Sequence, residues 1–236
     1  MSEARAIVLL PTYNEHGNLQ AAVEAILKTQ CADILVIDDN SPDGTGDLAD
    51  ILAEQYQEVF VLHRSSKAGL GKAYVSGFHW ALARNYTHIL QMDADLSHPP
   101  ALIPKMLELT HHYDVILGSR WVPGGGTVNW SMIRQWISKG GSFYARKLLG
   151  IPIRDVTGGF KCMKREVLET INLDELQSAG YVFQIEVTYR ALRSGFSVHE
   201  TPITFSERQV GKSKMSTRIV LEAIVRVPIL KRGIRS

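Results

Sequence analysis

The stretch from His88 to Ser97 reads HILQMDADLS, an apolar run followed by two aspartates that are one residue apart. A short apolar run that ends in polar residues is typical of a strand buried on both faces, as in a parallel sheet. Ligands of such sheets bind beyond the carboxyl ends of the strands. The position of Asp93 and Asp95 directly after this run therefore predicts a functional site at that edge.

Similar apolar runs recur through the first half of the chain and alternate with helical patterns. The runs are Ala6–Leu10, Ile34–Ile37, Val59–Leu62, His88–Met92 and Val115–Leu117. Helical spacing of apolar residues follows Asn18 and Thr45, which we predict as N-caps, and recurs between Tyr74 and Leu82. This alternation indicates βαβ units, so we predict an α/β fold with a doubly wound, mostly parallel sheet over residues 1 to about 120.

The second half predicts an amphipathic helix from Trp130 to Leu149 and further helices near Arg165–Ile171 and Phe183–Arg193. A strand is expected at Val198–Phe205, and Pro202 makes it an edge or bulged strand because proline cannot donate to a ladder. No repeat or low-complexity linker divides the chain. We predict one continuous domain over residues 1–215 and a basic amphipathic tail over residues 216–236.

Composition excludes several classes of protein. The 236 residues are 45% hydrophobic and 21% charged, as in ordinary globular proteins, and no apolar stretch approaches the roughly 18 residues of a spanning helix. Cys31 and Cys162 lack the spacing of a zinc module or a disulfide framework, so we expect a reducing, cytoplasmic setting. The net charge of +2 suggests no nucleic-acid partner.

That net charge is a cancellation between two regions. From Arg208 onward the chain holds eight basic residues and one acid, which leaves 18 basic and 23 acidic residues before it. The body is therefore acidic and the tail strongly basic, and a basic tail can bind the anionic surface of a membrane.

Acidic and polar residues follow three of the predicted strands. They are the segments Pro11–Glu15, Asp38–Thr45 and Asp93–Ser97. Carboxylates that converge on one edge repel each other unless a cation joins them, and their hard oxygen donors suit Mg²⁺ or Mn²⁺. An Asp-x-Asp sequence alone is more often a turn or a helix cap, and turn chemistry also explains Asp38 and Asp39. The place of Asp93 and Asp95 at a strand end favours a metal site.

Five segments, in this order and spacing, resemble the family-two glycosyltransferases of GT-A fold. They are Pro11–Glu15, Asp38–Thr45, Asp93–Pro100, Gly118–Arg120 and Arg208–Lys214. Within the family, the chain is most similar to dolichol-phosphate mannose synthases and bacterial polyprenol monophosphomannose synthases. The resemblance implies a nucleotide-sugar site at the carboxyl ends of the strands.

The resemblance also implies roles for individual residues. Pro11, Tyr13, Glu15 and Asp39 match positions that hold the nucleotide, and Asp93, Ala94 and Asp95 match the metal and diphosphate element. Ser97 stands where relatives often have a glutamine that binds the metal. We expect Ser97 to be a metal ligand, although serine departs from the family pattern. Arg120, Arg134 and Arg208 match basic positions that face phosphates, and Lys214 lies in the matching basic loop. The expected catalytic residues are Asp95, Arg120 and Arg134.

The activity implied by the resemblance is inverting transfer of mannose from GDP-mannose to a polyprenyl monophosphate. A phosphate monoester is already ionised at neutral pH, so its oxygen needs no general base. Arginine suits the task of holding two anionic reactants together because its planar guanidinium binds phosphate in a bidentate manner.

The sequence also contains a segment that is typical of contact with lipid. Between Trp130 and Leu149, apolar and aromatic residues are interleaved with basic ones, as in an interfacial segment, although a core-packing helix would have the same apolar pattern. We expect peripheral association with the cytoplasmic face of a membrane, where a membrane protein is a possible partner.

Two alternatives remain open at this stage. The first is a related family-two enzyme that transfers glucose or another sugar to a lipid phosphate or a glycan. The second is a non-catalytic module that binds a nucleotide sugar, against which the intact pair of Asp93 and Asp95 argues.

Overall fold

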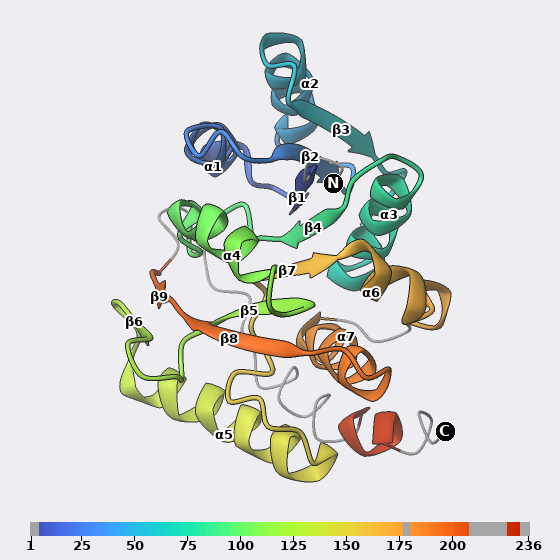
Figure 1. Cartoon of the computed structure of the whole chain (residues 1–236). Helices are drawn as coiled ribbons and strands as arrows, with labels where there is room; N and C mark the ends of the chain where they lie inside the picture. Colours follow the sequence, from blue (N-terminus) through green and yellow to red (C-terminus); the bar gives the residue numbers. More distant parts are fainter. Residues whose placement is uncertain (1–4, 177–179, 208–225, 232–236) are drawn as a thin grey trace.

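The structure is a computed structural model that describes residues 5–176, 180–207 and 226–231 (Figure 1). Its strands are β1 (Ala6–Thr12), β2 (Asp33–Asp38), β3 (Val59–His63), β4 (His88–Gln91), β5 (Val115–Ser119), β6 (Gly126–Thr127), β7 (Lys161–Lys164), β8 (Val198–Pro202) and β9 (Thr204–Phe205). Its helices are α1 (His16–Leu27), α2 (Thr45–Gln55), α3 (Leu70–Leu82), α4 (Ile103–Leu109), α5 (Met132–Leu149), α6 (Arg165–Thr170) and α7 (Gly180–Arg193), with 3₁₀ turns at Pro100–Leu102 and Leu173–Glu175.

Seven strands form one mixed sheet in the order β3-β2-β1-β4-β7-β5-β8. The strands are parallel except β7, which runs antiparallel between β4 and β5. The predicted doubly wound, mostly parallel sheet is confirmed. Strand β7 was not predicted, because Lys161-Cys-Met-Lys164 has only two apolar residues and they lie between lysines.

Helices cover both faces of the sheet, and each face has its own apolar core. Helices α1, α2 and α4 lie on one face and α3, α6 and α7 on the other, as Figure 1 shows. Side chains of one strand alternate between these cores: Ile7 and Leu9 of β1 pack with the α3 side, and Val8 and Leu10 with the α1 side. This alternation explains why the strand is apolar throughout.

Helix α5 lies outside this sandwich, beside the edge strand β8 (Figure 1). A third core cluster joins Ala145 and Leu149 of α5 to Ile185 and Tyr189 of α7 and to Val227. Val227 lies in a helical segment over residues 226–231, so this part of the predicted tail packs against the body.

Three local predictions need correction. Helix α1 begins at His16 with Glu15 at the N-cap, so Asn18 lies inside the helix, where its amide donates to Glu15 Oε2 at 2.9 Å. Helix α2 begins at Thr45 itself, and the N-cap is Gly44 with a φ of 85°. The strand expected at Val198–Phe205 breaks after Pro202 into β8 and β9, and β8 is indeed an edge strand.

Candidate functional site

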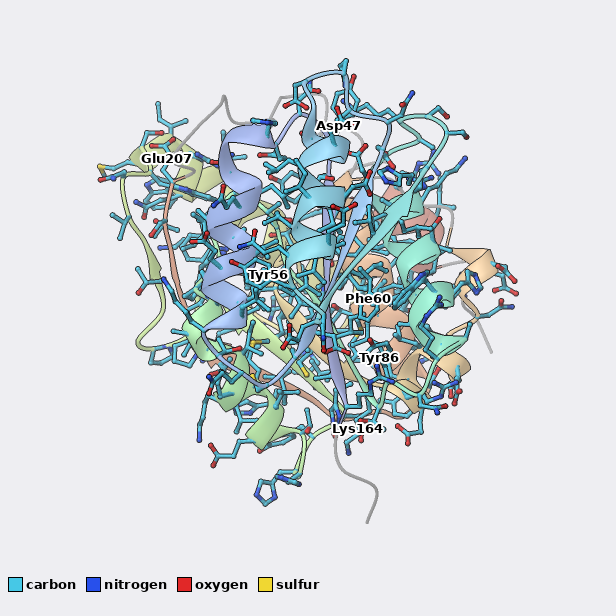
Figure 2. The ribbon with its side chains drawn as sticks, turned by 90° about the horizontal axis from the view of Figure 1, so that it is seen from above. Asp47, Tyr56, Phe60, Tyr86, Lys164 and Glu207 are labelled. Atoms are coloured by element: carbon cyan, nitrogen blue, oxygen red, sulfur yellow. The ribbon has the colours of Figure 1, made fainter. Side chains whose placement is uncertain are left out.

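A cavity of about 280 Å³ lies at the carboxyl ends of the parallel strands. Figure 2 shows this end of the molecule near Asp47 and Glu207, with Tyr86 and Lys164 at the opposite end. The predicted site residues that line the cavity are Pro11, Tyr13, Glu15, Asp39, Asp93, Ala94, Asp95, Arg120 and Arg134. Ser97 is not part of the lining, and Arg208 and Lys214 lie outside the described residues.

The loop after β4 carries the two aspartates. Asp95 is buried and accepts a hydrogen bond from the backbone N–H of Ser97 at 3.1 Å, whereas the Asp93 side chain is 38% exposed. Leu96, between Asp95 and Ser97, has a φ of 60°, in the left-handed region. The loop therefore brings both carboxylates to the cavity, Asp93 partly exposed and Asp95 held by a backbone N–H.

His98 supports this loop from inside the protein. Its ring stacks on Phe160 at 5.3 Å between centroids, and its Nδ1 accepts a hydrogen bond from the Asp93 N–H at 3.1 Å. Burial lowers the pKa of His98 to about 4. The imidazole is therefore neutral at pH 7 and acts as an acceptor that fixes the backbone of Asp93.

The residues expected to hold the nucleotide lie at the ends of β1 and β2. The ammonium of Lys67 sits over the Tyr13 ring, 3.7 Å from its centroid. Asp39 is buried, forms an ion pair with Arg64, and accepts from the N–H of Ala68 at 3.3 Å. These contacts hold an aromatic ring and a carboxylate in fixed positions on one side of the cavity.

Arg120 has a buried partner that sequence reasoning did not identify. Its Nε and Nη2 donate to the two carboxylate oxygens of Asp155, both at 2.7 Å, and Nη2 also donates to Thr157 Oγ1 at 3.0 Å. Burial by itself would lower the pKa of Arg120, but the carboxylate of Asp155 outweighs burial and the pKa is raised. Asp155 thus fixes a permanent positive charge in the cavity wall.

Arg134 lies at the first turn of α5. Its guanidinium carbon is 3.9 Å from the centroid of the Trp130 ring, and Nη1 is 3.3 Å from Glu207 Oε1. Ser131 caps this helix, and its hydroxyl accepts from the N–H of Arg134 at 3.3 Å. The start of α5 therefore contributes both a cation and an aromatic ring to the cavity.

Lys161 and Gln184 form a second pair that the sequence did not reveal. The Lys161 ammonium is fully buried, donates to the carbonyl of Gln184 at 3.2 Å, and also donates to the side-chain Oε1 of Gln184. Burial lowers the pKa of Lys161 to about 7, against the opposing effect of Asp155 and Asp93. The sequence Lys161-Cys-Met-Lys164 carries no local signal of this pair, because its two apolar residues lie between lysines.

The donor set of the loop fits a hard divalent cation. Ser97 Oγ is buried and has no hydrogen-bond partner among residues 5–176, 180–207 and 226–231. No group of three or more His, Cys, Asp or Glu side chains within those ranges could enclose a metal. Asp93, Asp95 and Ser97 supply oxygen atoms of the kind that Mg²⁺ and Mn²⁺ prefer, and a bound diphosphate would complete the coordination.

Residues 7–171 match the family described as Glycosyl transferase family 2. The chain belongs to this family, as its Asp-x-Asp loop at the end of β4 indicated.

Two relatives extend the likeness over almost the whole chain. The chain is 46% identical over 224 residues to the undecaprenyl-phosphate mannosyltransferase of Micrococcus luteus, covering 94% of this chain and 92% of that protein. It is 48% identical over 227 residues to the polyprenol monophosphomannose synthase of Mycolicibacterium smegmatis, covering 94% and 85%.

Solved structures of low sequence identity share the GT-A fold. The mannosyltransferase PcManGT of Pyrobaculum calidifontis, solved with GDP-Man and Mn²⁺, matches with a TM-score of 0.61 at 13% identity over 98% of this chain and 74% of that one. Staphylococcus aureus TarS, solved with UDP-GlcNAc, matches with a TM-score of 0.65 at 16% identity over 96% and 66%.

Proposed function

We propose that this protein transfers mannose from GDP-mannose to a polyprenyl monophosphate with inversion at the anomeric carbon. The observation that carries the proposal is the meeting of the Asp93 and Asp95 loop with Arg120 and Arg134 around one cavity. Two anionic substrates need such a mixture of a metal site and fixed cations. The two relatives named for mannose transfer to polyprenyl phosphates support the choice of sugar and acceptor.

In the proposed reaction an ionised oxygen of the lipid phosphate attacks the anomeric carbon. A new carbon–oxygen bond forms as the bond to the diphosphate breaks, and GDP leaves with the electron pair. No proton has to be removed from the nucleophile, because a phosphate monoester is already anionic at neutral pH. A divalent cation held by Asp93 and Asp95 would neutralise charge on the leaving diphosphate.

The arginines have separate tasks in this proposal. Arg120 is held rigidly by Asp155, so it stabilises negative charge without having to reorganise. Arg134 is bound to Glu207, whose side chain is 45% exposed, and an arriving lipid phosphate would replace that carboxylate. Arg208 and Lys214 stay proposed phosphate contacts from the segment that lies outside the described residues.

A transfer assay tests the proposal. The protein is incubated with Mg²⁺ or Mn²⁺, a polyprenyl phosphate and a panel of GDP-mannose, GDP-glucose, UDP-glucose and UDP-N-acetylglucosamine. We expect lipid-linked product from GDP-mannose, with a β anomer by NMR. Product from another sugar only would favour the related transferase, and binding without product would favour a non-catalytic module.

The variant Asp95→Ala tests the role of the metal-binding carboxylate in the same assay. Loss of a metal-binding carboxylate should lower turnover by about a hundredfold or more. Asp174→Asn is the matched control, because the Asp174 side chain is 85% exposed and forms an ion pair with His79.

We also propose that α5 places the enzyme on a membrane surface. Its exposed apolar side chains are Met132, Ile133, Trp136, Ile137 and Phe143, with exposed fractions from 42% to 73%. Lys139 and Lys147 are exposed on the same helix. Aromatic, aliphatic and basic side chains on one helix suit an anionic bilayer, into which the apolar groups insert while the lysines meet headgroups.

The position of α5 relative to the cavity supports this role. Trp130 and Arg134 line the cavity, while Met132 and Ile133 between them are each 73% exposed. A lipid phosphate could therefore pass from the bilayer to the cavity over the start of one helix.

No helix in the described part of the chain is long and apolar enough to cross the bilayer. We place the enzyme on the cytoplasmic face, where the unpaired cysteines Cys31 and Cys162 suit a reducing compartment. The basic tail over residues 216–236 is a proposed second contact with the membrane.

Flotation with liposomes tests this placement. The triple variant Met132→Ser/Ile133→Ser/Trp136→Ser should bind vesicles with anionic lipid at least about tenfold less, because three apolar groups no longer enter the bilayer. Ile51→Ser is the control, since Ile51 is 58% exposed on α2, at the far end of the molecule from α5 (Figure 1). Equal flotation of all three proteins would contradict the role of α5.

A further inference from the structure

The buried amide of Gln184 carries an inference beyond the mannosyl transfer proposed above. Gln184 is 2% exposed and lines the cavity from α7. Its Nε2 has no hydrogen-bond partner among residues 5–176, 180–207 and 226–231. A buried donor without a partner is destabilising, so a donor kept in this state beside a cavity points to a ligand that satisfies it.

The orientation of this amide is fixed by Lys161. The Lys161 ammonium donates to Oε1 of Gln184 and to its backbone carbonyl. An ammonium has only donors, so while Lys161 is protonated the oxygen of the amide faces it and the NH₂ group faces away from it. Rotation of the amide by 180° would place two donors against each other, and this cost keeps Nε2 available to a ligand.

The space beside Nε2 is kept open by Gly159. A Cβ at this position would lie 3.7 Å from Gln184 Nε2, 3.8 Å from Asp93 Oδ1 and 3.5 Å from His98 Cε1. These are ordinary van der Waals distances, and the backbone of Gly159 does not have the left-handed φ that would demand glycine. The backbone conformation therefore does not require glycine here. The absence of a side chain leaves a gap between the amide donor and the carboxylate of Asp93.

The order of strands identifies what part of the substrate would reach this gap. Proposed nucleotide contacts lie after β2 and β1, Asp93 lies after β4, and Gly159 precedes β7, which is next in the sheet. A nucleotide sugar with its base at β2 and its diphosphate at Asp93 would direct its sugar toward β7 and α7. The groups that a sugar offers there are hydroxyls, which can accept from an amide N–H.

We propose that Gln184 is a specificity-determining residue whose Nε2 donates to a hydroxyl of the transferred sugar, and that Lys161 is the positioning residue that orients it. This inference rests on the proposed function, because it assumes a nucleotide-sugar donor with its diphosphate at Asp93.

Deoxy-sugar analogues test the contact. We compare kcat/KM for GDP-mannose with that for its 2-, 3-, 4- and 6-deoxy forms, in the wild type and in Gln184→Leu. In the wild type, one deoxy form should be disfavoured by about tenfold or more, because it leaves the amide unpaired. In Gln184→Leu that preference should fall to about one, while the preferences at the other positions stay unchanged. Unchanged preferences at every position would overturn the proposal.

Binding of GDP alone distinguishes a local effect from damage to the fold. Gln184→Leu and Gly159→Ala should bind GDP as the wild type does and bind GDP-mannose more weakly. Gln91→Leu is the control for the first variant, because Gln91 is also fully buried but lies outside the cavity lining. Gly126→Ala is the control for the second, because a Cβ there meets no atom within 4 Å.

The positioning role of Lys161 has its own readout. Lys161→Met frees the amide to rotate, so it should reduce the same deoxy preference that Gln184→Leu abolishes. A merely structural lysine would change activity equally for every sugar, and that result would overturn its role. A wild type that transfers no sugar from any GDP-sugar would refute the proposed function, whereas an active wild type with an unaltered Gln184→Leu profile would refute only this inference.

Discussion

Single residues in this protein show how a buried charge is made stable by its partner. Arg120 and Asp155 have side chains that are 6% and 0% exposed, and they share two hydrogen bonds of 2.7 Å. Asp155 also accepts from the backbone N–H of Arg120 at 2.9 Å and lies 35 residues away along the chain. The pair connects the loop after β5 to the loop before β7, and so it shapes the cavity wall.

Asp155→Asn should lower the free energy of unfolding by about 3–5 kcal/mol, because it leaves the Arg120 charge buried without a counter-charge. Urea unfolding measures this change. The control is Glu108→Gln, in the exposed pair of Glu108 with Lys105, which should change stability by less than about 0.5 kcal/mol. Similar small effects of both variants would show that Asp155 is not needed as an anion.

The buried Lys161 predicts a pH dependence of stability. The pKa of Lys161 is about 7 in the folded protein, whereas an ordinary lysine has a pKa of 10.5. Between these values the unfolded chain binds more protons, so this group makes the free energy of unfolding rise from pH 7 toward pH 10.5. Below pH 7 both states are protonated, and the full cost of the buried charge remains.

Lys161→Met should lack this rise. Urea unfolding at pH 7, 8.5 and 10 gives the free energy of unfolding of the wild type and of the variant. Subtracting one from the other at each pH removes the contributions of the other titrating groups. The difference should move in favour of the wild type as the pH increases. Parallel curves for the two proteins would contradict a depressed pKa of Lys161.

At the scale of elements, the close approach of α3 to the sheet depends on one glycine. A Cβ on Gly77 would lie 2.5 Å from Ile37 Cδ1 and 3.1 Å from Leu9 Cδ1. Tyr74 and Phe78 on the same helix stack with Phe183 of α7, and the ring planes of Tyr74 and Phe183 are nearly parallel, at an angle of 1°. Helix α3 thus has little freedom to move outward, because α7 holds it in place.

Gly77→Ala should therefore destabilise the protein by about 1–3 kcal/mol through overpacking, although alanine is the better helix former. Thermal unfolding of the variant measures the effect. Gly140→Ala on α5 is the matched control, because a Cβ there meets no atom within 4 Å and the helix should gain stability. A gain in both variants would show that α3 has room to shift.

At the scale of the whole molecule, the cavity is built from separate parts of the chain that meet only in the folded state. Its lining extends from Pro11 near the N-terminus to Phe205 beyond β8. A ligand in this cavity binds only the folded protein, so its binding free energy adds to the stability of the whole domain.

GDP with Mg²⁺ should therefore raise the melting temperature of the protein. At a concentration of 100 times its Kd, a ligand adds about 2.7 kcal/mol, which corresponds to roughly 5–10 °C for a domain of this size. Removal of the metal with EDTA, or the variant Asp95→Ala, should reduce the shift. A shift that is equal with and without metal would contradict metal-assisted binding of the diphosphate.

The sequence by itself determined the strands of the parallel half and the place of the Asp93 and Asp95 loop. These features depend on local patterns: a strand buried on both faces must be apolar throughout, and the residue after it must lie at the sheet edge. The two N-cap predictions at Asn18 and Thr45 were wrong, because polar residues near a helix start compete for the cap and only the local backbone decides between them.

Tertiary structure alone decided the features that depend on distant contacts. Strand β7 exists because β4 and β5 pair with it on both sides, which no local pattern of Lys161–Lys164 encodes. The partners Arg120 with Asp155 and Lys161 with Gln184 are 35 and 23 residues apart. The amphipathic pattern of α5 was compatible with a core helix or a surface helix, and only packing beyond the edge strand left its apolar side chains exposed. Periodicity specifies which face of an element is apolar, but the arrangement of neighbouring elements determines what that face meets.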